Sequence, residues 1–178
     1  MELDLRWRYN NIRIKEGDKW KTVFTMYIGA YEPTVMYFGL TNSPATFQII
    51  MNDLFHNLIN QGDTATFIDD ILVATDTEEG HNELVEEVLK RLEENDLFVK
   101  PEKCKWKVRE VEFLGVVIGP KGVKIQREKV EKVLNWLAPR NVKEVQKFLD
   151  LTNYYRRFIK DFARIAALLH MLVRKEQK

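Results

Sequence analysis

Alternating apolar and polar positions predict a sheet in the first part of the chain. Apolar side chains recur at every second position over 3–7 and again at Ile12 and Ile14, which is the spacing of a strand with one buried face. The composition of 16–18 predicts a turn, and the residues after it predict a further strand over 22–27.

Apolar positions at helical spacing predict five helices. The first begins where Asn42-Ser43-Pro44 supplies a capping residue and a proline at the first helical position. We expect helices over 44–60, 77–95, 127–137, 142–158 and 162–173. The last three follow one another, so the C-terminal part of the chain is predicted to be helical.

Two β-hairpins are expected between the helices. Two short apolar runs over 65–75 surround the pair Asp69-Asp70, as in a tight hairpin. A strand over 111–118 is followed by the turn composition of 119–122 and by a short return strand, which predicts a second hairpin.

The charge changes where the predicted helical part begins. Residues 1–120 contain 13 Lys and Arg against 21 Asp and Glu, whereas 121–178 contain 15 against 6. A basic part either balances an acidic neighbour or binds a polyanion, and the asymmetry alone does not decide between them. We therefore predict an α+β fold with a first domain over 1–120 and a basic helical unit over 121–178.

The composition excludes several classes of protein. A chain of 178 residues with 45% hydrophobic residues has the material for a packed core and is not intrinsically disordered. Cys104 is the single cysteine and there are three histidines, which excludes an internal disulfide and argues against a zinc site. The longest apolar runs fall short of a membrane span and the N-terminus lacks signal-peptide character, so we expect an intracellular protein without a membrane partner.

The pair Asp69-Asp70 is the first candidate for chemistry. Two carboxylates at a hairpin tip repel each other unless a cation neutralises them, and Mg²⁺ does so while keeping open positions for phosphate oxygens. Aspartate is also a common turn residue. The two residues by themselves leave both interpretations open.

An ordered set of segments carries a more specific signal. The segments are Leu3-Asp4-Leu5-Arg6-Trp7-Arg8-Tyr9, Phe38-Gly39-Leu40-Thr41-Asn42-Ser43-Pro44-Ala45-Thr46-Phe47-Gln48, Phe67-Ile68-Asp69-Asp70, Lys100-Pro101-Glu102-Lys103-Cys104, Phe113-Leu114-Gly115, Val145-Gln146-Lys147-Phe148-Leu149 and Asn153-Tyr154-Tyr155-Arg156-Arg157-Phe158. In this order they resemble the motifs of the reverse transcriptases, the RNA-directed DNA polymerases, of gypsy-class long-terminal-repeat retrotransposons. The resemblance implies a right-hand polymerase palm with the catalytic hairpin over 1–120, an antiparallel sheet with packed helices, followed by a helical thumb and the start of the connection over 121–178.

The resemblance implies that Asp4, Asp69 and Asp70 hold two Mg²⁺ ions, for which Mn²⁺ is a substitute. In this family the ions lower the pKa of a primer 3′-hydroxyl and stabilise the leaving pyrophosphate during template-directed transfer of a deoxynucleotide. Lys103 is the candidate proton donor to the pyrophosphate, and an ordinary surface lysine is the alternative interpretation.

Four further residues are expected at the incoming deoxynucleoside triphosphate. Tyr9 matches the position whose ring excludes a ribose 2′-hydroxyl, although a packed strand aromatic has the same signal. Phe38 and Gly39 are expected to lie against the nucleotide, where a missing side chain lets the backbone approach, although a turn needs the same glycine. Arg8 lies beside this pocket, where the family usually has a tiny residue.

The remaining expected site residues contact an RNA or DNA template with its primer. Gln146, Asp150 and Tyr154 are spaced by four and share a helix face, which in this family follows the minor groove. Further contacts are expected from Phe67, Phe113, Leu114, Gly115, Arg156 and Arg157. The apolar residues of the Phe113-Leu114-Gly115 segment could instead belong to the core, and the two arginines could merely solvate their helix.

The sequence departs from the family pattern in ways that favour a second hypothesis. Arg8 and Asp150 stand where a tiny residue and a glycine are expected, and Phe67 replaces a tyrosine. The match begins almost at Asp4, so we expect a palm and thumb without the fingers segment. The alternative is a catalytically dead, degenerate or repurposed domain that binds nucleic acid or protein.

The expected partners and location follow from both hypotheses. A palm without its fingers would be covered by a second copy of the chain or by a fingers segment supplied separately. The expected compartment is the cytoplasm or a particle, with the nucleus as the alternative.

Overall fold

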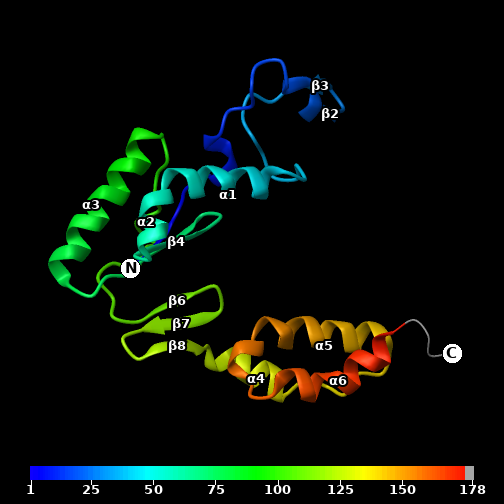
Figure 1. Ribbon diagram of the computed structural model, residues 1–178. Coiled ribbons are helices and arrows are strands. Elements are labelled where there is room, and N and C mark those ends of the chain that lie inside the picture. The colour runs from blue at the N-terminus through cyan, green and yellow to red at the C-terminus, as the bar shows by residue number, and fades with distance from the viewer. Residues whose placement is uncertain (175–178) are drawn as a thin grey trace. The chain divides into compact units, whose positions relative to one another are not determined.

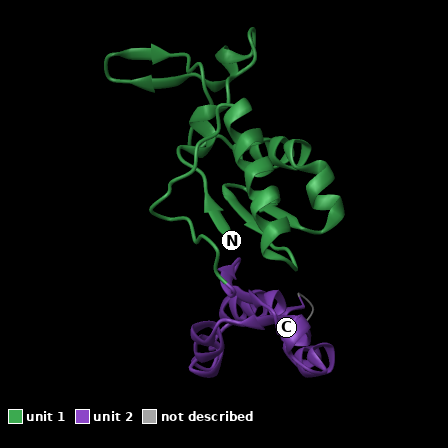
Figure 2. Ribbon diagram, turned by 90° about the vertical axis from the view of Figure 1, so that its left-hand side faces the viewer, with its two compact units in different colours: residues 1–108 green, residues 109–178 purple. Residues whose placement is uncertain are grey.

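The computed structural model describes residues 1–174 and divides into two compact units. Unit 1 is Met1–Val108 and unit 2 begins at Arg109 (Figure 2). This division lies before the second hairpin, whereas the sequence pattern placed it near residue 120. The hairpin stays whole because its strands hydrogen-bond to one another as one sheet. The palm and thumb bounds remain a prediction.

Unit 1 contains a three-stranded antiparallel sheet (Figure 1). Strand β1 (Glu2–Asp4) pairs with β5 (Asp70–Val73), and β5 pairs on its other edge with β4 (Thr64–Phe67). Leu3 and Ile71 are fully buried. Their burial follows from the alternation of side chains between the two faces of a strand.

Three helices contribute to the same core as this sheet: α1 (Ser43–Leu54), α2 (His56–Gln61) and α3 (Glu78–Glu94). The sequence predicted one helix over 44–60, but the helix breaks at Phe55, whose side chain is fully buried. The break lets apolar side chains of both helices reach the core. The helical spacing of apolar residues in the sequence does not reveal such a break.

The predicted strand alternation over 3–14 ends after Asp4. Trp7 and Arg8 have left-handed backbone conformations with φ of 59° and 31°, and a 3₁₀ turn over Arg8–Asn11 follows. Beyond β1 this segment forms isolated bridges rather than a ladder. Without a partner strand, alternating side chains are insufficient to make a strand.

The strand predicted over 22–27 is present as part of a two-stranded hairpin. A 3₁₀ turn at Lys19–Thr22 leads into β2 (Phe24–Met26), which pairs with β3 (Gly29–Tyr31). All residues of both strands are exposed.

Unit 2 combines a small antiparallel sheet with helices. Its elements are β6 (Val111–Phe113), β7 (Val116–Gly119), β8 (Gly122–Ile125), α4 (Arg127–Leu134), α5 (Val142–Tyr154) and α6 (Phe162–Val173). Val145, Leu149 and Ala166 form the core in which α5 meets α6. The helix predicted over 142–158 ends at Tyr154, before a 3₁₀ turn.

The two units together confirm the predicted α+β class, with antiparallel sheets and packed helices followed by a helical part. Within residues 1–174, every helix is too short or too polar to traverse a lipid bilayer.

Candidate active site

Three carboxylates from neighbouring strands converge in unit 1. Asp4 ends β1 and lies opposite Asp70, the first residue of β5, in the antiparallel register. Asp69 precedes Asp70 in the turn between β4 and β5. One oxygen of each of the three carboxylates lies within 4.8 Å of the other two. The structure thus brings the three predicted metal ligands together.

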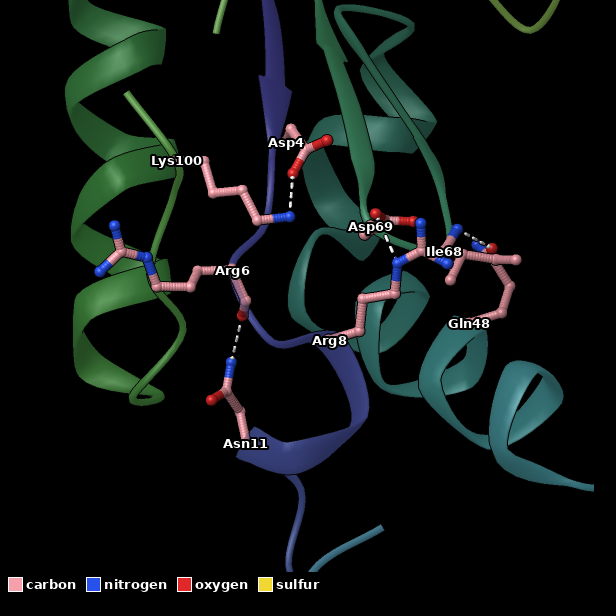
Figure 3. A network of polar contacts seen from close by, with 8 residues as sticks. All are labelled: Asp4, Arg6, Arg8, Asn11, Gln48, Ile68, Asp69 and Lys100. Atoms are coloured by element: carbon pink, nitrogen blue, oxygen red, sulfur yellow. Dashed lines mark hydrogen bonds and ion pairs between the residues drawn. The ribbon is translucent and has the colours of Figure 1, made fainter. Parts of the chain in front are cut away.

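The turn that carries Asp69 is held by a side chain of α1. Ile68 has a φ of 54°, a left-handed conformation that is costly for a β-branched residue. The Ile68 amide donates a hydrogen bond of 2.7 Å to Gln48 Oε1 (Figure 3). Gln48 Nε2 donates one of 3.2 Å to the Thr66 carbonyl. Gln48 therefore fixes the hairpin from outside the sheet.

The sequence analysis assigned no role to Gln48. It stands within a resemblance segment beside Phe47, which is fully buried. A polar residue among core-facing positions was the available signal, because a buried or half-buried polar group needs a partner. Which backbone group it serves depends on the fold.

The three carboxylates bring negative charge together in a partly buried site. Asp69 is buried, whereas Asp4 and Asp70 are half-buried. Burial, followed by the carboxylates of Asp69, Asp4 and Glu2, raises the pKa of Asp70 above its usual value. Oxygen donors at this spacing are the ligands that Mg²⁺ prefers, and a divalent cation offsets their mutual repulsion. The donor set fits such an ion.

Two cations of the protein itself contact the cluster. Lys100 Nζ lies 2.7 Å from Asp4 Oδ1, and Arg8 Nε lies 2.6 Å from Asp69 Oδ2 (Figure 3). Lys100 reaches β1 because its amide donates a hydrogen bond of 2.8 Å to the Asp4 carbonyl. Sequence reasoning included Lys100 in a motif without a role, since its pairing with β1 is not a local pattern.

Lys103, the predicted proton donor, lies one turn further along the chain. It is exposed, and its amide donates to the Lys100 carbonyl at 2.9 Å. Among the ion pairs of residues 1–174, the partner of Asp4 is Lys100, and Lys103 has none. Its role as a proton donor remains a prediction.

Among the residues expected at the nucleotide, Tyr9 and Arg8 each lie near the ring of Phe38, and Arg8 also pairs with Asp69. Tyr9 is 5% exposed, and its ring centroid lies 5.0 Å from that of Phe38 and 5.8 Å from that of Phe47. Phe38 is exposed, and Gly39 has a φ of 105°. Arg8 Cζ lies 6.0 Å from the Phe38 ring centroid, which joins Arg8 to both groups.

In unit 2, Phe113 ends β6, and Leu114 and Gly115 form the turn that leads into β7. Phe113 is buried, so its ring belongs to the core. The Tyr154 hydroxyl donates a hydrogen bond to the Leu114 carbonyl, and a Cβ on Gly115 would lie 2.8 Å from the Tyr155 hydroxyl. The turn is therefore fitted against the C-terminal end of α5.

The other predicted nucleic-acid contacts are accessible. Gln146, Asp150 and Tyr154 are exposed on α5, at the spacing of one helix face. Two basic residues, Arg156 and Arg157, are exposed in the 3₁₀ turn that follows. Phe67, at the end of β4 in unit 1, is also exposed and lies opposite Asp70.

Comparison with known families shows to which family this chain belongs. A family model described as reverse transcriptase (RNA-dependent DNA polymerase) matches residues 1–118. The chain belongs to the reverse transcriptase family. Enzymes of this family use divalent metal ions, generally Mg²⁺, which agrees with the three clustered aspartates.

Relatives of this reverse transcriptase domain occur in transposons. The Transposon Tf2-3 and Tf2-7 polyproteins of Schizosaccharomyces pombe are each 33% identical to it over 175 residues, which is 98% of this chain. The chain spans 13% of the length of these polyproteins.

Solved reverse transcriptases share the fold. The foamy viral protease-reverse transcriptase in complex with RNA/DNA hybrid matches with a TM-score of 0.81 and 30% identity, covering 99% of this chain and 24% of that one. The form of the same viral protein designated dRH, in complex with double-stranded DNA, matches with a TM-score of 0.84 and 31% identity, covering 97% and 30%. These matches confirm the predicted polymerase fold.

Proposed function

We propose that this domain is the polymerase part of a gypsy-class retrotransposon reverse transcriptase, and that it transfers deoxynucleotides to a primer 3′-hydroxyl under the direction of a template. One observation carries the proposal: the carboxylates of Asp4, Asp69 and Asp70 converge within 4.8 Å in a chain of this family. The similarity to transposon polyproteins supports the retrotransposon class.

Asp4, Asp69 and Asp70 would hold two divalent ions, Mg²⁺ or its substitute Mn²⁺. When bound, the ions would activate the primer 3′-hydroxyl and neutralise charge on the leaving pyrophosphate. Gln48 would keep the hairpin turn in place, and Lys100 would orient Asp4 through its contact with Oδ1. Lys103 would supply a proton to the pyrophosphate.

Deoxynucleotide selection would depend on Tyr9. Its ring is buried and packs edge-on against Phe38 and Phe47, and in this position it would oppose a ribose 2′-hydroxyl. The exposed Phe38 and the side-chain-free Gly39 would lie against the deoxynucleoside triphosphate.

The nucleic acid would be held mainly by unit 2. Gln146, Asp150 and Tyr154 would face the minor groove, while Arg156 and Arg157 would contact phosphates. Leu114 and Gly115 would contact the primer backbone, and Phe67 the template-primer near the aspartates. The complexes of the similar viral enzyme with RNA/DNA hybrid and with double-stranded DNA support this partner class.

Primer extension on an RNA template tests the proposed activity. We expect the purified chain to extend a primer in Mg²⁺ or Mn²⁺, and the double variant Asp69→Asn, Asp70→Asn to lose this activity by at least about 10²-fold, because amides keep the shape but not the charge that holds the ions. Asp53→Asn, at an exposed position of α1, is the matched control and should retain activity. Absence of extension by the folded parent in both metals would contradict the proposal.

A second candidate function has one observation in its favour. Arg8 pairs with Asp69 at 2.6 Å and so places a protein cation on a residue that catalysis needs. The alternative is therefore a domain without catalysis that binds nucleic acid or protein. Duplex binding by the parent without any primer extension in either metal would favour it.

A further inference from the structure

The backbone at Arg8 has a conformation that suits glycine. Trp7 and Arg8 are consecutive residues with φ of 59° and 31°. Side chains other than glycine adopt this left-handed region at a cost, and bulky ones do so rarely. Arg8 therefore carries a long side chain at a backbone position where glycine is sterically favoured.

The turn directs the guanidinium group of Arg8 onto Asp69. Figure 3 shows this contact, in which Nε lies 2.6 Å from Oδ2. The side chain of Asp69 is 5% exposed, whereas that of Arg8 is 38% exposed. Arg8 thus approaches from the solvent side and covers an oxygen of the buried carboxylate. Its other neighbour is the ring of Phe38, at 6.0 Å from Cζ.

The pair occupies one of the two carboxylate oxygens of Asp69, a member of the aspartate cluster. Guanidinium does not lose its proton in proteins, so the positive charge stays in place at all ordinary pH values. A divalent ion that binds Asp69 must either displace this group or share the carboxylate with it, and both cost free energy. Because the Arg8 side chain is partly exposed, it can turn into solvent when a metal ion displaces it from Asp69.

We propose that Arg8 is an internal counter-cation that competes with a divalent metal ion for Asp69 and so weakens metal binding at the aspartate cluster. This inference rests on the proposed function, since it requires the cluster to bind a metal. It makes residue 8 a determinant of metal affinity at the active site, in addition to the three ligands.

Binding of Mn²⁺ to the purified full chain, followed by titration calorimetry or by the electron paramagnetic resonance of the free ion, tests this proposal. We expect Arg8→Gln and Arg8→Gly to bind Mn²⁺ about tenfold more tightly than the parent, because the competing charge is gone. Arg8→Lys keeps the charge and should bind within about threefold of the parent. Arg6→Gln is the matched control: it removes one positive charge two residues away, from an exposed arginine that forms no ion pair among residues 1–174.

Three outcomes would overturn the proposal, and they separate it from the metal site itself. Equal affinity in the parent, Arg8→Gln and Arg8→Gly, with binding lost in the Asp69→Asn, Asp70→Asn double variant, would leave the metal site intact and exclude competition by Arg8. Tighter binding in Arg8→Gly alone would assign the effect to the backbone at φ 31° rather than to charge. An absence of Mn²⁺ binding in every folded variant would exclude the metal site and with it the inference.

Discussion

The pKa of Asp70 is affected by the repulsion among the clustered carboxylates. The residue is half-buried, and burial together with the carboxylates of Asp69, Asp4 and Glu2 raises its pKa. Arg8 acts in the opposite direction and offsets only part of this effect. Ionisation of Asp70 is therefore less favourable in the folded protein than in the unfolded chain when no metal is bound.

This imbalance predicts a pH-dependent stabilisation by Asp70→Asn. Because the pKa is raised above the unfolded value of 3.8, the folded state binds more protons than the unfolded state between the two pKa values, and this part of the stability is lost as pH rises through the folded pKa. An amide does not titrate. We expect the variant to be more stable than the parent at neutral pH without metal, and to lose this advantage in acid.

Urea denaturation at a series of pH values in the presence of a chelator measures the effect. Asp53→Asn makes the same chemical change at an exposed position of α1 and should follow the parent at every pH. An Asp70→Asn variant that is less stable than the parent at neutral pH, or equally displaced from it at all pH values, would contradict the argument.

Among the elements, the turn between β6 and β7 depends on a close fit to α5. Gly115 has a φ of 79°, and any Cβ there would lie 2.8 Å from the hydroxyl of Tyr155, which is buried. The neighbouring Leu114 also has a left-handed conformation, with a φ of 49°, and its carbonyl accepts from the Tyr154 hydroxyl. The turn and the helix end therefore form one packed structure inside unit 2.

Gly115→Ala should destabilise the protein by about 2–4 kcal/mol, from left-handed backbone strain plus the collision with Tyr155. Gly122→Ala is a matched control within the same sheet. Gly122 has a φ of 95° and nothing within 4 Å of its Cβ position, so it should show the backbone strain of about 1–2 kcal/mol alone. Equal losses in urea denaturation would show that the close approach to Tyr155 costs nothing.

On the scale of the whole molecule, charge is segregated along the chain. Residues 121–178 contain 15 basic and 6 acidic residues, whereas 1–120 are acidic overall and contain the aspartate cluster. A basic surface supplies affinity for the phosphate backbone of nucleic acid, and it does so independently of sequence. Arg156 and Arg157 are both exposed in this basic part.

The double variant Arg156→Gln, Arg157→Gln should bind an RNA/DNA hybrid more weakly, with similar losses of affinity for unrelated sequences. Removing one arginine that binds a phosphate should reduce the slope of log K against log salt by about 1, so we expect a decrease of about 2 for the pair. Fluorescence anisotropy of a labelled hybrid at several salt concentrations measures both quantities. The control Lys19→Gln, Lys21→Gln removes the same charge from unit 1, and an equal change in slope there would exclude specific binding of phosphates by the arginines.

Much of the architecture follows from local pattern. The spacing of apolar residues correctly predicted helices α3 and α6 and the hairpin of β4 and β5. Each of these elements buries one face, and the buried face sets the period of its apolar positions. The order of the motifs indicated the reverse transcriptase family, which the family match confirms. The sequence also identified the three aspartates as a group.

Tertiary structure decided the features that depend on distant partners. The helix break at Phe55 and the loss of strand structure after Asp4 follow from which neighbours each segment meets, and no local period encodes that choice. The contacts of the two cations with the aspartates also depend on the folded chain. Arg8 reaches Asp69 through a left-handed turn, and Lys100 reaches Asp4 through backbone pairing across 96 positions. By itself, the sequence determined the composition and family of the site. The charges that meet there depend on contacts between segments, which only the folded chain specifies.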